Sequence, residues 1–327
     1  LGLLEGDAVA AEAGELEALS DEEFARVLPR VRVIARSTPL LKMRVVKQLR
    51  SEGNVVAVTG DGINDAPALK NADVGIAMGI SGTEVSKEAA DIVLLNDSFS
   101  TIVTAVKWGR GIYENFKRFI QFQLTVNVAS VLLVFLCTVI GLFVEGFASP
   151  FSALDLLWIN LIMDGPPALT LGLEPMRDDL MSRKPTARSE NIISEGMLPR
   201  IVVNGVFVCL VCLAQLSWNF LGVEQAAVAT SVFTLFVMFQ LFNAFNCREL
   251  GNESIFPRLF KNRLMLIAFV VAFALQVLIT QFGGAVFDTV PLDVLSWLKV
   301  VGIALSVFVL DELVRLVRRA ARRKVGK

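Results

Sequence analysis

Apolar runs long enough to cross a lipid bilayer recur from Phe116 onward, whereas the first third of the chain mixes charged and apolar positions. A helix of about 20 apolar residues spans the hydrocarbon core. The pattern therefore predicts an all-α bundle of six transmembrane helices. Their expected bounds are 116–143, 154–173, 198–221, 227–246, 264–282 and 293–314.

Short β-branched runs alternate with helical patterns in the soluble part. Residues 55–58 and the stretches DVGIAM and DIVLL predict strands, and GTEVSKEAA predicts a helix between the last two. Residues 59–62, Thr-Gly-Asp-Gly, predict a sharp turn, and residues 64–67 predict a helix start. This alternation predicts an α/β domain with a doubly wound parallel sheet, whose sites lie at the carboxyl ends of strands.

The loops between the predicted spans differ in charge. VEGFASPFSALD, GVEQAA and GGAVFDTVPLD carry no Lys or Arg, whereas the alternate loops and the tail RLVRRAARRKVGK are basic. The positive-inside rule places the basic loops, the soluble part and the C-terminus in the cytoplasm. Trp158, Trp218 and Trp297 then lie near the outer interface, where an aromatic belt is expected.

Composition supports a membrane protein. The 327 residues include no histidine, 54% are hydrophobic and 19% are charged, and the mean hydropathy is +0.61, too apolar for an ordinary soluble domain. The net charge of −1 indicates no class of partner. Cys209 and Cys212 lie in an apolar run, which favours helix packing over redox or metal chemistry.

Two polar residues fall in the middle of the second predicted span, LDLLWINLIMDGPPALTLGL. Asn160 and Asp164 are four residues apart and share a helix face. A carboxylate at mid-membrane costs about 2.5–3.5 kcal/mol. The Gly-Pro-Pro that follows should break the helix and free carbonyls, as in transporter cation sites. The alternative, a hydrogen-bonded aspartate that only holds helices together, leaves the break unexplained.

Amides in neighbouring spans extend the candidate site. Asn127 is the deepest amide of the first span, and beside Asp164 we expect it to be a ligand rather than a helix–helix contact. Gln240 and Asn243 fit interhelical hydrogen bonds better, although Gln240 is a further candidate ligand. An all-oxygen set favours a hard cation such as Ca²⁺ or Mn²⁺. Ca²⁺ takes about six to eight oxygens, so these side chains form an incomplete site.

The glycine turn carries a second candidate site. Asp61 and Asp65 are expected at the end of a strand, with Asn64 between them. Two carboxylates and an amide suit Mg²⁺ bound together with phosphate oxygens. The alternative is a capped turn with a solvated acidic edge.

The longer stretch TGDGINDAPALKNADVGIAMG resembles the hinge motif of P-type ATPases, cation pumps that form a phosphoaspartate from ATP. The resemblance covers nearly the whole chain and implies a haloacid-dehalogenase-like (Rossmannoid) phosphorylation domain. ARSTPLLKMRVVKQLR resembles the segment in which a lysine reaches the phosphoryl group, and Lys42 matches that lysine. By the same resemblance Asp61 and Asp65 hold Mg²⁺, and Asn64 and Asp65 organise the phosphorylated site.

The membrane half refines the resemblance. FIQFQLTVNV and LLWINLIMD resemble plasma-membrane-type calcium pumps, and MDGPPALTLGLEP resembles secretory-pathway Ca²⁺/Mn²⁺ pumps, except that Leu169 replaces their usual glutamine. Reticulum-type calcium pumps carry glutamates where this chain has Ser130 and Gln240. Losing two carboxylates should disable the first of their two calcium sites, so we expect one Ca²⁺ to be transported per ATP. Both Ca²⁺ and Mn²⁺ remain candidates for the transported ion.

The family's Asp-Lys-Thr-Gly, nucleotide-binding domain, actuator domain and first four spans are not found. The chain is therefore expected to be the C-terminal part of a pump, inactive alone, with the N-terminal half as its partner. The predicted parts are the end of the phosphorylation domain (1–105), a stalk (106–118), spans five to ten of the parent pump (116–314) and a basic tail (315–327). The stalk should continue as one helix into the first span here.

The setting is expected to be a multi-pass membrane protein surrounded by lipid, in a bacterial inner membrane. No nucleic acid is expected as a partner. The tail is expected to be the inner end of the last span rather than a site for a calmodulin-like regulator. A non-catalytic membrane fragment or regulatory subunit is the alternative function, against which the intact loop residues argue.

Overall fold

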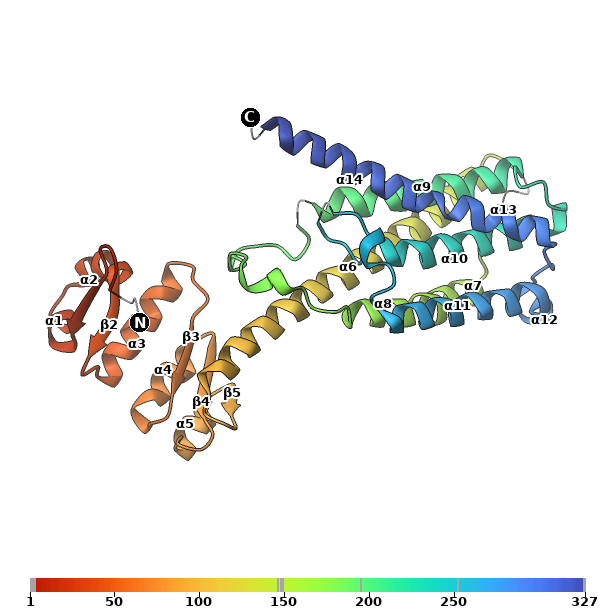
Figure 1. Ribbon diagram of the computed structural model, residues 1–327. Coiled ribbons are helices and arrows are strands. Elements are labelled where there is room, and N and C mark those ends of the chain that lie inside the picture. The colour runs from red at the N-terminus through yellow and green to blue at the C-terminus, as the bar shows by residue number, and fades with distance from the viewer. Residues whose placement is uncertain (1–3, 146, 148–149, 195, 252, 326–327) are drawn as a thin grey trace. The chain divides into compact units, whose positions relative to one another are not determined.

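The computed structural model describes residues 4–145, 147, 150–194, 196–251 and 253–325. Its contacts divide the chain into two compact units. Unit 1 comprises Leu1–Trp108 with Met181–Glu190, and unit 2 comprises Gly109–Leu180 with Asn191–Lys327. Unit 1 contains the strands and unit 2 the long helices (Figure 1).

Unit 1 contains two small parallel sheets among its described residues. One pairs β1 (Val9–Glu12) with β2 (Val31–Ala35), and the other has the order β3 (Ala57–Gly60), β4 (Val74–Met78), β5 (Ile92–Leu94). The predicted parallel pairing is confirmed. The doubly wound order is not seen in the part of the chain described, because the three strands follow one another without a reversal.

Helices connect these strands. They are α1 (Ala13–Glu17), α2 (Asp21–Val27), α3 (Pro39–Ser51), α4 (Ala66–Asn71) and α5 (Glu84–Ala89), with short 3₁₀ turns η1 (Leu28–Arg30) and η2 (Ile63–Asp65). Thr38 caps α3 by accepting a hydrogen bond from the Leu41 N–H at 3.2 Å, and Pro39 follows at the first helical position. Phe24 and Leu41 lie in a small apolar core beside β1 and β2.

The elements of unit 2 in the described part of the chain are all helices. The first of them, α6 (Phe99–Gly141), is 43 residues long and begins within unit 1. The predicted continuous helix through the stalk is therefore confirmed, and it starts earlier than expected. The later elements are α7 (Ala153–Trp158), the π-helix η3 (Ile159–Met163), α8 (Gly165–Gly172), η4 (Asp178–Met181), α9 (Met197–Trp218), η5 (Gln225–Ala227), α10 (Val228–Asn246), η6 (Phe256–Arg258), α11 (Arg263–Phe282), α12 (Gly284–Phe287), α13 (Val294–Ala304) and α14 (Ser306–Val325).

Four described helices are long and apolar enough to cross a membrane, rather than the six expected. They are Phe99–Gly141, Met197–Trp218, Gln225–Asn246 and Arg263–Phe282. The other two predicted spans are interrupted. Residues 154–173 divide at Asp164, next to two prolines, and residues 293–314 divide at Leu305, where the Phe308 N–H turns back to the Leu305 carbonyl at 3.0 Å.

Helix α10 forms the centre of unit 2. Its residues are buried on every face, and it packs against α9, α11, α13 and α14 (Figure 1). A helix that is apolar all round is expected in such a position. Phe242 of α10 lies 5.5 Å from Phe269 and 5.6 Å from Phe308, between ring centroids. Cys209 and Cys212 are free thiols buried in the same core, as the packing interpretation predicted.

Candidate active site and cation site

The glycine turn after β3 folds Asp65 back over the end of its own strand. A Cβ at position 60 would lie 2.4 Å from the Asp65 Cβ, so this close approach requires glycine. One Asp65 oxygen accepts hydrogen bonds from the N–H groups of Asp61 at 3.3 Å and Gly62 at 3.2 Å. The other oxygen pairs with the Lys42 ammonium.

These contacts set the charge of Asp65. Burial alone would raise the pKa of its carboxyl, but the hydrogen bond from Lys42 and the two backbone N–H groups outweigh burial and hold that pKa below its usual value. The structure therefore brings Lys42 and Asp65 together as an ionised pair, as expected of two residues at one site.

Helix α5 holds the backbone of Asp61. The Asp61 carbonyl accepts hydrogen bonds from the Thr83 N–H at 2.9 Å and from the Ser86 hydroxyl at 3.1 Å, and Ser86 is fully buried. The side chains of Asp61 and Asn64 are exposed. Thr83 and Ser86 were missed by sequence reasoning, although their place at a helix start was a signal for such contacts.

The loop offers Mg²⁺ an exposed carboxylate, Asp61, beside an exposed amide, Asn64. Both oxygens of Asp65 are already engaged, so its predicted role as a Mg²⁺ ligand would require one of these contacts to be given up. No group of three or more His, Cys, Asp or Glu able to hold a metal occurs in the described ranges. Asp61 thus fits Mg²⁺ together with oxygens from another source.

In unit 2, Asp164 lies where the predicted helix break occurs. Its N–H bonds the Ile159 carbonyl at 2.9 Å, five residues back, and its carbonyl accepts from the Ala168 N–H at 3.0 Å as α8 begins. Pro166 and Pro167 have no N–H to donate to carbonyls of the preceding turn. The break is therefore a π-helix followed by a new α-helix, rather than an unwound segment.

The Asp164 side chain is 1% exposed. Neither of its carboxylate oxygens has a hydrogen-bond partner among the described residues. The alternative of a hydrogen-bonded aspartate that holds helices together therefore lacks the bonds it needs. A buried oxygen without a hydrogen-bond partner lowers the stability of the fold. A bound ligand would supply the missing partner, so this carboxyl group is suited to bind one.

The amide side chains considered as ligands differ in their exposure to solvent. Asn127 of α6 and Asn160 of the π-helix are exposed, whereas Gln240 and Asn243 of α10 are each 1% exposed. The oxygen and nitrogen of both α10 amides are buried without a partner in the part of the chain described, so the interhelical hydrogen bonds expected of them are not made. Helix α10 packs against both the π-helix and α8, which flank Asp164.

Comparisons with known protein families agree with this division of the chain. Residues 43–106 match the model of haloacid dehalogenase-like hydrolases, and residues 148–317 match the model "Cation transporting ATPase, C-terminus". The first match coincides with the loop that carries Asp61, and the second covers most of unit 2.

Curated relatives with closely similar sequences include plant proteins. The chain is 39% identical over 305 residues to the probable calcium-transporting ATPase 6, plasma membrane-type, of Oryza sativa, which covers 91% of the chain and 29% of that protein. It is 41% identical over 295 residues to calcium-transporting ATPase 12, plasma membrane-type, of Arabidopsis thaliana, covering 90% and 28%. The chain thus spans less than a third of these relatives, and plant relatives give no support to the expected bacterial membrane. Because a single family model covers more than half of its residues, the chain belongs to the cation-transporting ATPases and corresponds to their C-terminal part.

Proposed function

We propose that this chain is the C-terminal half of an ATP-driven calcium-transporting P-type ATPase, which exports Ca²⁺ from the cytosol through a phosphoaspartate cycle. The observation that carries the proposal is the buried, unpartnered carboxylate of Asp164 between two helical segments. Burying a carboxyl group in an apolar helix bundle costs free energy. In membrane proteins such buried groups mark ion pathways. Oxygen ligands beside a broken helix suit a hard divalent cation.

The proposed membrane domain has six spans, with both ends in the cytoplasm. Four are single helices, and two are formed by the interrupted pairs α7–α8 and α13–α14. A span made of two short segments is compatible with a membrane because neighbouring helices can satisfy the freed backbone groups. The interruption at Asp164 then lies at a cation site.

The soluble loop is proposed to serve phosphoryl transfer. Lys42, oriented by Asp65, offsets charge on the phosphoryl group, while Asp61 projects its exposed carboxylate from a backbone fixed by Thr83 and Ser86. Mg²⁺, when bound, would neutralise phosphate charge, and Asp61 would hold it. The phosphorylated aspartate and the nucleotide site would come from the N-terminal half, so the chain alone is proposed to be inactive.

We further propose that one Ca²⁺ is carried per ATP. Ser130 and Gln240 supply no charge where a second site would need carboxylates. Asn127 and Asn160 are exposed on helices whose other exposed residues suit lipid. We propose that the N-terminal half covers these two amides and supplies the further ligands that complete the calcium site. The basic tail is proposed to be the inner end of the last span rather than a site for a calmodulin-like regulator.

The test is ATP-driven uptake of radioactive Ca²⁺ by inside-out vesicles carrying the full-length protein. Asp164→Asn should reduce uptake at least tenfold, because the charged ligand is lost. The matched control is Asp288→Asn, the same change at an exposed loop position with φ 50°, which asparagine tolerates. Uptake by Asp164→Asn above half of wild type would overturn the proposal. Uptake of Mn²⁺ in preference to Ca²⁺ would favour the secretory-pathway type instead.

A further inference from the structure

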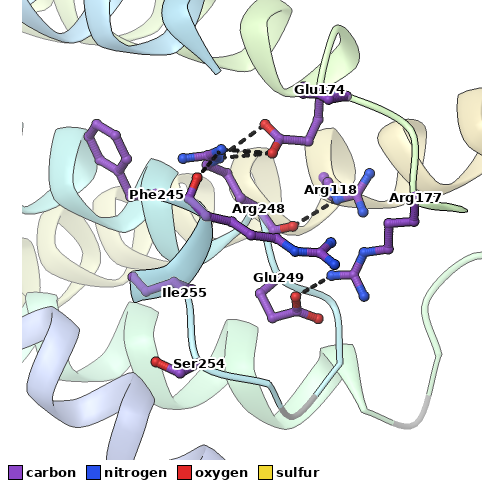
Figure 2. Close-up of a pocket in the computed structure, with 10 residues that line it drawn as sticks. Arg118, Glu174, Arg177, Phe245, Arg248, Glu249, Ser254 and Ile255 are labelled. Atoms are coloured by element: carbon purple, nitrogen blue, oxygen red, sulfur yellow. Dashed lines mark hydrogen bonds and ion pairs between the residues drawn. The ribbon is translucent and has the colours of Figure 1, made fainter. Parts of the chain in front are cut away.

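A pocket rich in arginine lies in unit 2 where α6, the end of α8, the end of α10 and the segment before α11 meet. Figure 2 shows it in close-up, with lining residues drawn as sticks. We call it the arginine pocket, and its charged lining residues are Arg118, Glu174, Arg177, Arg248, Glu249 and Arg258. These residues have no part in the proposed phosphoryl transfer or in the cation site.

Both carboxylates of the arginine pocket are already engaged. Glu174 receives Arg248 at 2.8 Å and the Asn262 amide at 2.8 Å. Glu249 pairs with Arg177 and accepts the Gly251 N–H at 2.7 Å (Figure 2). They therefore hold the pocket in shape and are not free to bind a cation.

Two of the guanidinium groups are satisfied within the protein. Arg118 pairs with Glu114 at 3.0 Å and donates to the Arg248 carbonyl at 2.9 Å, and Arg248 pairs with Glu174. Arg177 is less fully satisfied. The Nε of Arg177 is buried and donates to no acceptor in the described residues. The Arg177 side chain also lies 3.9 Å from Glu253, which is 69% exposed.

Arg258 differs from the other three arginines, because its guanidinium has no hydrogen bond or ion pair within the described ranges. The pocket thus presents a buried N–H donor and an uncompensated positive charge. An anionic oxygen would satisfy both, and the planar guanidinium fork matches phosphate geometry.

The space inside the arginine pocket measures about 20 Å³, which is room for one oxygen-sized group. A phosphate would insert one oxygen and keep the rest of the molecule outside. The segment that supplies Ile255 and Arg258 to the lining also carries Phe256, 59% exposed, and Phe260, 74% exposed. Exposed aromatic residues between basic ones are typical of a membrane surface.

The adjoining helix α11 presents an apolar face. Leu264, Ile267 and Val271 on that helix are 52%, 59% and 51% exposed, which suits contact with acyl chains. A soluble anion would gain nothing from these side chains, whereas a phospholipid would use both the basic pocket and the apolar face.

We propose that the arginine pocket binds the phosphate of an anionic phospholipid whose acyl chains lie along α11. The phosphate oxygen accepts from Arg177 Nε and is paired by Arg258. This proposal is independent of calcium transport, since none of its residues is assigned to that activity.

The test titrates the full-length protein in detergent with phosphatidylglycerol, with bound lipid counted by native mass spectrometry. Arg258→Gln should weaken binding about five- to tenfold, since one basic residue near an anionic headgroup contributes about that factor. Folding should survive, because this guanidinium has no internal partner. The matched control is Lys261→Gln, the same charge change in the same segment outside the pocket lining, which should leave affinity within twofold.

A second variant tests the buried donor. Arg177→Gln combined with Glu249→Gln removes the Nε donor and leaves net charge unchanged, and it should also weaken phosphatidylglycerol binding more than twofold. Equal losses in Arg258→Gln and Lys261→Gln would overturn the proposal in favour of diffuse charge attraction. Displacement of the lipid by inorganic phosphate of equal affinity would overturn it in favour of a soluble anion site.

Discussion

Individual residues in the glycine turn show how one short motif organises a site. Gly60 permits Asp65 to approach the end of β3, and Asp65 then holds both Lys42 and two backbone N–H groups. The motif and its resemblance pointed to Lys42, Asp61 and Asp65. They did not indicate that Asp65 uses both oxygens within the protein, because that depends on the folded positions of α3 and the loop.

Replacing Asp65 tests this arrangement. Because the pKa of Asp65 is lowered, its contribution to stability is complete above the ordinary carboxyl pKa of about 4 and is lost as pH falls through the lowered pKa. At pH 7, Asp65→Asn should reduce the free energy of local opening at the Asp61 and Gly62 amides by about 1 kcal/mol, after allowance for the half-exposed lysine. Hydrogen exchange measured by mass spectrometry would report this.

The control for Asp65→Asn is Asp91→Asn, which alters a similar bond to the Gly75 N–H at 2.8 Å and should leave the glycine turn unchanged. The difference between wild type and Asp65→Asn should shrink as the pH is lowered. If both proteins protect the Gly62 amide equally at pH 7, the ionised pair does not stabilise the loop.

At the scale of elements, α6 is fixed to unit 2 near its middle. The Asn115 amide donates to the carbonyls of Gly172 at 3.0 Å and Glu174 at 2.9 Å, and Arg118 donates to the Arg248 carbonyl at 2.9 Å (Figure 2). The continuity of α6 was predictable because no helix-breaking residue follows Gly111. The π-helix before Asp164 was not predictable, because hydrogen bonds to the fifth residue back do not change the hydrophobic pattern of a sequence.

A flexible insertion in α6 tests whether the helix transmits motion to the proposed cation site. Two glycines inserted after Gly109 fall where a side chain would meet nothing, so packing at Asn115 and Arg118 is kept. ATP hydrolysis by the full-length pump should continue while Ca²⁺ transported per ATP falls at least threefold. Vesicle uptake and phosphate release, measured together, give this ratio.

Two alanines inserted at the same place provide the control, because they lengthen the helix by the same amount but keep it stiff, whereas two glycines make it flexible. The alanine variant separates a change of register from a loss of rigidity. An unchanged ratio in the glycine variant would show that α6 does not transmit the motion.

At the scale of the whole molecule, the fold was predicted best from the sequence in those regions where one physical signal dominates. Hydropathy separated the soluble and membrane parts, and strand and helix periodicities gave the parallel pairing of β3, β4 and β5. The pairing of β1 with β2 was missed, since short strands in a mixed-charge segment lack a clear alternation. The arginine pocket was also missed, because its residues come from four distant segments, and only the folded bundle brings them together.

Stoichiometry is the property that belongs to the complete pump. Asp164 is the single carboxylate among the predicted calcium ligands, and the buried amide of Gln240 supplies no charge, so a second divalent ion would lack the anionic oxygens it needs. Equilibrium binding of radioactive Ca²⁺ to the full-length protein should therefore saturate at one ion per phosphorylation site, with a Hill coefficient of about 1. Asp164→Asn should remove that ion. Two ions per phosphorylation site with positive cooperativity would mean that residues outside this chain, or the unpartnered amides of Gln240 and Asn243, complete a second site.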